Sequence, residues 1–223
     1  MSQILAQPRF RGVMHHVMFF VSIVACIPLI LKSTNYTEAT SMIIYSVGLL
    51  SMFGFSALYH RRKSTIEVKK FLRKLDHTGI FLMIAGTFTP VCLLALPAES
   101  GLTLLTIIWI VAFIGILQSM FFGNIHRILR ASIYLIAGYV ALPFISVIFL
   151  SLSTSKIVLV IAGGVIYSIG ALAYGFRFPK LSPDVFGFHE VFHTLVIILS
   201  LIHISEPTRL RRISYAVLWV KKK

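Results

Sequence analysis

Charged residues are scarce in this chain, and acidic ones are the scarcest. Only 13% of the 223 residues are charged, and 7 Asp and Glu stand against 21 Lys and Arg. An ordinary soluble domain carries about 25% charged residues, so this shortage, together with 57% hydrophobic residues, excludes a water-soluble globular protein. Neither a Walker-type phosphate loop nor a dinucleotide-binding fingerprint is present. Nucleotide-dependent enzymes therefore have no support in the sequence.

Cysteine is nearly absent as well. The two cysteines, Cys26 and Cys92, lie inside long apolar runs, so neither a disulfide framework nor a cysteine-based zinc site is indicated. The net charge of +14 would suggest nucleic-acid binding in a soluble protein, but in so apolar a chain it reports on membrane topology. The expected partners are membrane lipids, and no nucleic acid.

Seven apolar runs approach the length of about 20 residues that crosses a bilayer. The first is as long as the others and is not followed by a small-residue cleavage site, so it is not a signal peptide. The sequence predicts an all-α polytopic membrane protein, a seven-transmembrane helix bundle that forms one domain over residues 1–204. Pro28, Pro90 and Pro143 are expected to kink or break spans 1, 3 and 5. The predicted spans lie near 13–31, 41–59, 79–97, 102–122, 131–150, 157–176 and 185–204.

Basic residues are distributed unevenly between the segments that join these spans. They concentrate in the N-terminal segment and in the second, fourth and sixth loops, whereas the other three loops hold only Lys32 and Lys156. The positive-inside rule then places the N-terminus in the cytoplasm and, with seven spans, the C-terminus outside.

The tail at 205–223 does not fit this pattern. It adds basic residues on the side that the rest of the chain assigns to the exterior, and its apolar piece at 213–220 is too short to span a membrane. We predict that the chain from about His203 onward is a gene-model artefact that replaces the genuine end of the last span. A basic, exposed tail is the alternative.

Histidine gathers at one predicted face of the membrane. Ionisable groups inside spans are costly and usually mark function, so some of these side chains are expected to share a role. The histidines at the predicted cytoplasmic ends of spans are His15, His16, His60, His77, His126, His189 and His193.

The spacing of three of these histidines favours a metal site. His189 and His193 are four residues apart, so both project from one face of a helix. With His60 from span 2 and one water, they would form an open, tetrahedral zinc site of the catalytic kind. Ser56, four residues before His60, and Asp76, where the chain enters span 3, are the candidate catalytic residues that would hold or orient the water.

Each of these residues also has a structural interpretation. The His189–His193 pair could anchor a span at the membrane interface, Ser56 could bond to its own helix, and Asp76 could cap span 3. The remaining cytoplasmic-end histidines, namely His15, His16, His77 and His126, are expected to be interfacial.

Residues 189–193 read His-Glu-Val-Phe-His, which matches the H-E-x-x-H motif of zinc metalloproteases. A protease would need Glu190 as its general base and a third metal ligand from a later helix, and only the doubtful tail follows. We therefore expect Glu190 to be an interfacial polar residue.

The same residues lie in blocks that resemble a known family. SALYH at 56–60, LDHTGIF at 75–81 and FGFHEVFH at 186–193 resemble the signature motifs of the progestin and adipoQ receptor (PAQR) superfamily. PRFRGVMHH at 8–16 resembles the opening of its bacterial hemolysin III branch. The similarity extends over roughly residues 8–202.

This resemblance implies a seven-helix bundle in the bacterial inner membrane, with its N-terminus inside. It implies zinc on three histidines that match His60, His189 and His193, with Ser56 and Asp76 near the metal-bound water. Because the family motifs are also similar to those of alkaline ceramidases, it implies hydrolysis of a lipid amide or ester, or a role in lipid homeostasis.

The sequence leaves two other functions open. A channel-forming cytolysin is implied by the hemolysin name, although the spans lack the repeated rings of polar residues that line selectivity filters. A receptor with structural zinc and no turnover is the other alternative.

Overall fold

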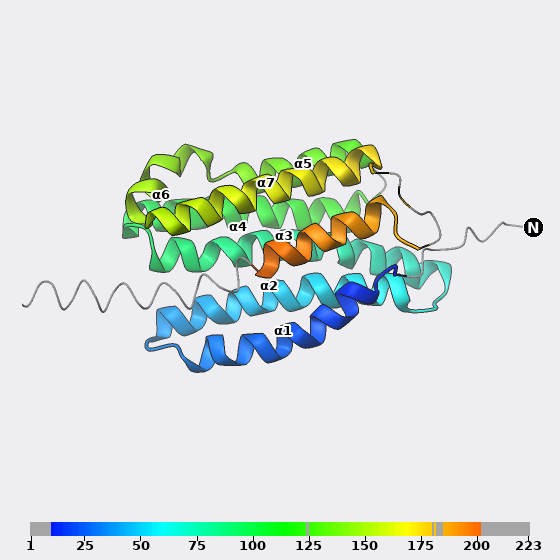
Figure 1. The fold of residues 1–223 in the computed structure, drawn as a ribbon, viewed down its shortest axis with the longest axis horizontal. Helices are drawn as coiled ribbons and strands as arrows, with labels where there is room; N and C mark the ends of the chain where they lie inside the picture. Colours follow the sequence, from blue (N-terminus) through cyan, green and yellow to red (C-terminus); the bar gives the residue numbers. More distant parts are fainter. Residues whose placement is uncertain (1–9, 124, 180, 182–184, 202–223) are drawn as a thin grey trace, which may run out of the picture.

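The computed structural model describes residues 10–123, 125–179, 181 and 185–201. In this part of the chain, long helices lie side by side and successive ones run in opposite directions (Figure 1). They are α1 (Val13–Leu31), α2 (Tyr36–Arg61), α3 (Ile66–Leu94), α4 (Ala98–Phe121), α5 (Arg127–Tyr139), the 3₁₀ turn η1 (Leu142–Phe144), α6 (Ile145–Ser151) and α7 (Thr154–Phe176). A shorter apolar helix, Phe188–Leu201, follows, and we call it the final helix.

Six segments of the described chain are long and apolar enough to cross a membrane. The all-helical membrane architecture predicted from the sequence is therefore confirmed. The predicted seventh span, 185–204, corresponds to the final helix, which is described from Phe188 to Leu201. His203 and the predicted artefact at 205–223 lie outside the described residues.

The fifth span is interrupted, as its proline predicted. α5 ends at Tyr139, and Pro143 lies in the short η1 turn before α6 resumes. A proline has no backbone N–H and its ring clashes with the preceding turn, which explains the break. Pro28 and Pro90, in contrast, lie inside α1 and α3, which continue through them.

The second loop is shorter than the sequence predicted. α3 begins at Ile66, and the Thr65 side chain accepts a hydrogen bond from the Val68 N–H at its N-terminus. Much of the basic segment that precedes the predicted span is therefore the first turns of α3. The apolar pattern alone missed this start because the first turns of α3 carry several cationic side chains and so lack a continuous apolar run.

Close packing of α2 on α3 sets the position of the site. A Cβ atom on Gly48 would lie 2.7 Å from the Leu82 carbonyl oxygen, and one on Gly79 would lie 3.0 Å from the Met52 Cα. Small residues let two helices approach closely in a membrane. This approach aligns the end of α2 with the first turns of α3, which brings Ser56 next to Asp76.

The final helix packs between the two halves of the bundle. Val196 and Ile197 contact the buried cluster that α1 and α2 form around Leu49 and Phe53. On its other side, Phe192 lies against Gly170 of α7. The final helix therefore faces residues from both ends of the chain.

Candidate metal centre

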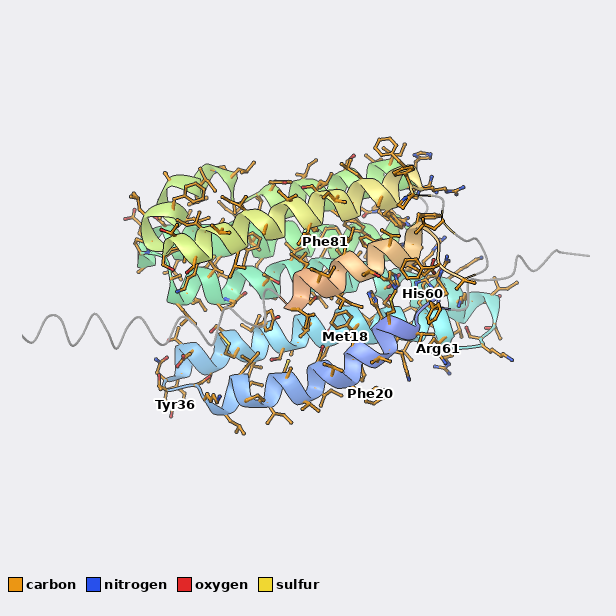
Figure 2. All side chains as sticks on the ribbon, in the orientation of Figure 1. Met18, Phe20, Tyr36, His60, Arg61 and Phe81 are labelled. Atoms are coloured by element: carbon orange, nitrogen blue, oxygen red, sulfur yellow. The ribbon has the colours of Figure 1, made fainter. Side chains whose placement is uncertain are left out.

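The three histidines predicted to bind metal lie at one end of the bundle. His60 is the second-last residue of α2, and Figure 2 shows it at the opposite end from Tyr36, where that helix begins. His189 and His193 lie on the first turns of the final helix. Because α2 ends where the final helix begins, all three imidazoles come from helix termini at the same face.

The three side chains are close enough to share an ion. Their nitrogen atoms lie within 4.8 Å of one another, and Nε2 of His189 is 3.0 Å from Nε2 of His60. A tetrahedral zinc with Zn–N bonds of about 2.0–2.1 Å separates its ligand nitrogens by about 3.4 Å. The 3.0 Å separation and the 4.8 Å limit bracket this value, which fits three ligands of one ion. Three neutral imidazoles are also a donor set that zinc favours.

Ser56 and Asp76 lie on the wall of the cavity onto which these histidines open. The Ser56 side chain hydrogen-bonds the Asp76 carboxyl. Asp76 is ten residues into α3, about 15 Å from its start at 1.5 Å per residue. The structural interpretation of Asp76 as the cap of this helix is therefore wrong, because Thr65 occupies that position.

Glu190 is buried rather than interfacial, which corrects the expectation from the sequence. Its side chain is 1% exposed, and Arg11 Nε donates to its Oε1 across 2.5 Å. Its other oxygen, Oε2, accepts from the Gly187 N–H at 2.8 Å. Oε1 thus ties the N-terminal turn at residues 10–12 to the final helix, and Oε2 caps the start of that helix. With both oxygens occupied, Glu190 is poorly placed to act as the general base of a protease.

The expectation for His15 is wrong as well. This side chain is buried, and its ring stacks on His193 with centroids 3.8 Å apart and planes 9° from parallel. The ring edge of Phe53 packs on its other side at 5.0 Å. His16 and His126, in contrast, are exposed, in keeping with their predicted interfacial positions.

His77 is also buried, in a second polar contact. Its Nε2 lies 2.7 Å from Nη1 of Arg130, which reaches it from α5. A lone His or Arg in the sequence gives no indication of such a pairing, because the partners are 53 residues apart. The sequence offered one indication, namely that ionisable side chains such as His77 and Arg130 are energetically costly within a membrane and usually have a partner.

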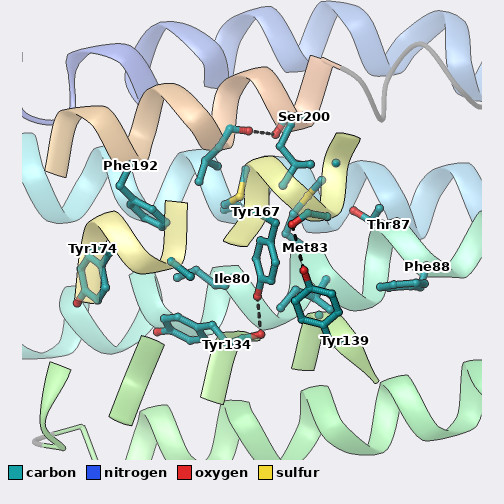
Figure 3. A pocket seen from close by; sticks show the side chains of 18 of the residues that line it. Ile80, Met83, Thr87, Phe88, Tyr134, Tyr139, Tyr167, Tyr174, Phe192 and Ser200 are labelled. Atoms are coloured by element: carbon teal, nitrogen blue, oxygen red, sulfur yellow. Dashed lines mark hydrogen bonds between the residues drawn. The ribbon is translucent and has the colours of Figure 1, made fainter. Parts of the chain in front are cut away.

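A cavity of about 790 Å³ extends from the histidines along the bundle. Its lining follows α3 from Asp76 to Ala95, a distance of about 28 Å at 1.5 Å per residue. Figure 3 shows Tyr134 and Tyr174 towards one end and Thr87 and Phe88 towards the other. The histidine end is polar and the rest is lined mainly by apolar side chains, so the cavity suits an amphipathic molecule.

Comparison with known proteins agrees with this geometry. The profile of a family described as haemolysin-III related matches residues 3–204. The chain belongs to this family. Hemolysin-3 of Bacillus cereus is 32% identical to this haemolysin-III-related protein over 202 residues, which cover 88% of each chain. A hemolysin-3 homologue of Bacillus subtilis (strain 168) is 32% identical, over 74% of this chain and 78% of its own.

A more distant relative connects the family to eukaryotic receptors. The adiponectin receptor protein of Drosophila melanogaster is 28% identical over 187 residues, which cover 75% of this chain and 42% of its own. The membership in the PAQR superfamily that the motifs predicted is confirmed. The chain is an integral membrane protein of that superfamily.

Proposed function

We propose that this protein is a zinc-dependent lipid hydrolase, or a lipid-homeostasis sensor derived from one. The observation that carries the proposal is the position of His60, His189 and His193 at the polar end of a long apolar cavity. A metal site that opens onto such a cavity can hold the polar head of a lipid while the chain lies among the helices.

The residues around the histidines fit the cleavage of an amide or ester. A zinc ion bound there would supply a Lewis acid that acidifies water and polarises a carbonyl. Asp76, the one carboxylate among the described lining residues, accepts the proton of the attacking water. Ser56 donates its one hydroxyl proton to Asp76 and so orients that carboxylate towards the water.

The proposal includes an orientation in the bacterial inner membrane, which the same arrangement supports. The final helix starts at the His60 end of the bundle and would complete a seventh span if it continued to residue 204. The N-terminal turn, at the same end, would then face the cytoplasm, in keeping with the basic loops. The site would meet lipids of the inner leaflet.

Two related proteins suggest other roles. The name of the Bacillus cereus relative indicates a haemolysin, and a cytolysin would need a water-filled path. The apolar lining beyond the histidine end does not provide one among the described residues. The name of the Drosophila relative indicates a receptor, for which the same site would bind zinc and lipid without turnover.

Zinc content is the first test. Elemental analysis of detergent-purified protein is expected to give about one zinc per chain, and a His189→Ala/His193→Ala variant is expected to lose it. Acyl lipids and ceramides would then be screened for hydrolysis, with Asp76→Asn as the variant that keeps zinc and loses turnover. Folded wild-type protein that never binds zinc would refute the proposal, whereas bound zinc without hydrolysis of any lipid would favour the receptor.

A further inference from the structure

A second polar group lines the cavity beside the histidines. It comes from α5 and the end of α7, and we call it the arginine wall. Arginine supplies all the formal cations among the described lining residues, whereas Asp76 is the one carboxylate there. This end of the cavity is therefore strongly positive. The arginine wall consists of Arg127, Arg130, Tyr134 and Arg177.

Arg130 is fixed in place by neutral partners. Its Nη1 lies 2.7 Å from Nε2 of His77, and its Nη2 donates to the Gly123 carbonyl at 2.6 Å. A guanidinium has only donors, so Nε2 of His77 must be the acceptor and the ring proton must be on Nδ1. Because both partners are uncharged, they do not neutralise the positive charge of Arg130. Asp76 interacts with this charge through space, without an ion pair.

Tyr134 adds a donor that the described residues do not satisfy. It lies one helical turn after Arg130 and is 5% exposed, and its hydroxyl has no hydrogen-bond partner in the described part of the chain. Buried hydroxyl groups nearly always find a partner. A ligand with an acceptor oxygen on the cavity side would satisfy this hydroxyl and lie against the charge of Arg130.

Arg127 and Arg177 extend the positive wall from the same end. Arg127 uses its Nε to donate to the Gly175 carbonyl at 3.1 Å, which ties α5 to the end of α7. Arg177 follows directly after α7, with a left-handed backbone at φ 56°. Charges from two helices thus face one volume, an arrangement that suits a group with several anionic oxygens.

We propose that the arginine wall binds the phosphate of a lipid headgroup. Guanidinium groups match phosphate oxygens in geometry and form the stronger, charge-assisted class of hydrogen bond. The acyl part would occupy the apolar cavity, and its carbonyl would face the histidines. This inference rests on the proposed function and specifies the substrate or ligand as a phosphate-bearing acyl lipid.

Lipid binding to the purified protein tests this assignment. Dioleoyl phosphatidylglycerol and dioleoylglycerol, which share their chains, would be titrated in a neutral detergent and the bound lipid measured by native mass spectrometry. Tyr134→Phe and Arg127→Gln are each expected to weaken phosphatidylglycerol binding roughly tenfold, the loss of one charge-assisted hydrogen bond. Binding of dioleoylglycerol should not change in either variant.

A surface control separates the cavity from general attraction between basic loops and anionic lipid. Arg62 and Lys63 are exposed at the same end of the bundle and do not line the cavity. An Arg62→Gln/Lys63→Gln variant is expected to bind phosphatidylglycerol as the wild type does. The assignment is overturned if this control loses as much affinity as the wall variants, or if both wall variants bind like the wild type.

Inorganic phosphate distinguishes the lipid headgroup from a free anion. Phosphatidylglycerol should remain bound in a large excess of inorganic phosphate, and complete displacement at equal concentration would overturn the lipid assignment. The measurement does not depend on zinc or turnover. If wild-type protein never binds zinc and still binds the phosphate headgroup selectively, the proposed hydrolase is refuted and the arginine wall remains supported.

Discussion

Removing Arg11 should disturb the histidine cluster although Arg11 is not among its proposed ligands. The guanidinium is the charged partner of Glu190, which is 1% exposed, while the Arg11 side chain is 22% exposed. Arg11→Ala would leave a buried carboxylate with the Gly187 N–H as its remaining partner. Truncating one member of a buried ion pair costs about 3–5 kcal/mol, and the partial exposure of Arg11 places the expected cost near the lower value, about 3 kcal/mol.

This loss of stability should affect the histidine cluster directly, because Glu190 lies between His189 and His193 in the sequence. About 3 kcal/mol corresponds to roughly a hundredfold loss if the whole cost falls on the zinc-bound state. Zinc affinity would be measured by competition with a chromogenic chelator, alongside thermal unfolding in detergent. Arg62→Ala, on an exposed loop residue, is the matched control. An Arg11→Met/Glu190→Gln double variant should recover most of the affinity, because it leaves no buried charge.

Additive effects of the two substitutions on zinc affinity would contradict this prediction. If Arg11→Met and Glu190→Gln each weaken zinc binding and the Arg11→Met/Glu190→Gln variant shows the sum of the two losses, the two side chains act independently. Wild-type zinc affinity in Arg11→Ala would lead to the same conclusion, namely that the N-terminal turn does not position the final helix.

Three further substitutions test the packing and the ligands. Gly12→Ala should destabilise the folded protein by about 1–2 kcal/mol, because Gly12 has a left-handed backbone. It should also lower zinc occupancy, because a Cβ there would lie 2.5 Å from the His60 Cβ. Unchanged zinc content by elemental analysis would contradict this. His60→Ala should abolish zinc binding while the helical circular dichroism spectrum persists, and retained stoichiometric zinc would exclude it as a ligand. Gly48→Leu should force α2 from α3 at a cost of about 1–3 kcal/mol or more, seen as a lower unfolding temperature, whereas Gly164→Leu, in a looser position, should change it little.

The sequence predicted the features that depend on local patterns. Apolar runs of membrane length identified the helices, and the break at Pro143 followed from the missing N–H. The i, i+4 spacing of His189 and His193 predicted a shared helical face. Topology then placed His60 at the same membrane side, so its proximity to the pair could be expected without any knowledge of the packing.

The remaining contacts depend on pairings between distant parts of the chain. His15 and His16 are adjacent in sequence, yet one is buried on His193 and the other is exposed, and only the rotation of α1 decides which. Arg130 and His77 were likewise unremarkable as single residues at the ends of spans. Glu190 could have been suspected, since a carboxylate in so apolar a segment requires a partner, but nothing in the pattern named Arg11.

The separation between Arg11 and Glu190, 179 residues, has a consequence for biosynthesis. During synthesis at about 5–20 residues per second, roughly 10–35 s pass between the appearance of one partner and that of the other. Throughout that interval α1 has been synthesised, but His193, on which the His15 ring stacks, has not. The early helices must therefore persist in the bilayer with an incomplete polar end, and the three histidines that we propose as metal ligands come together only after the final helix has been made.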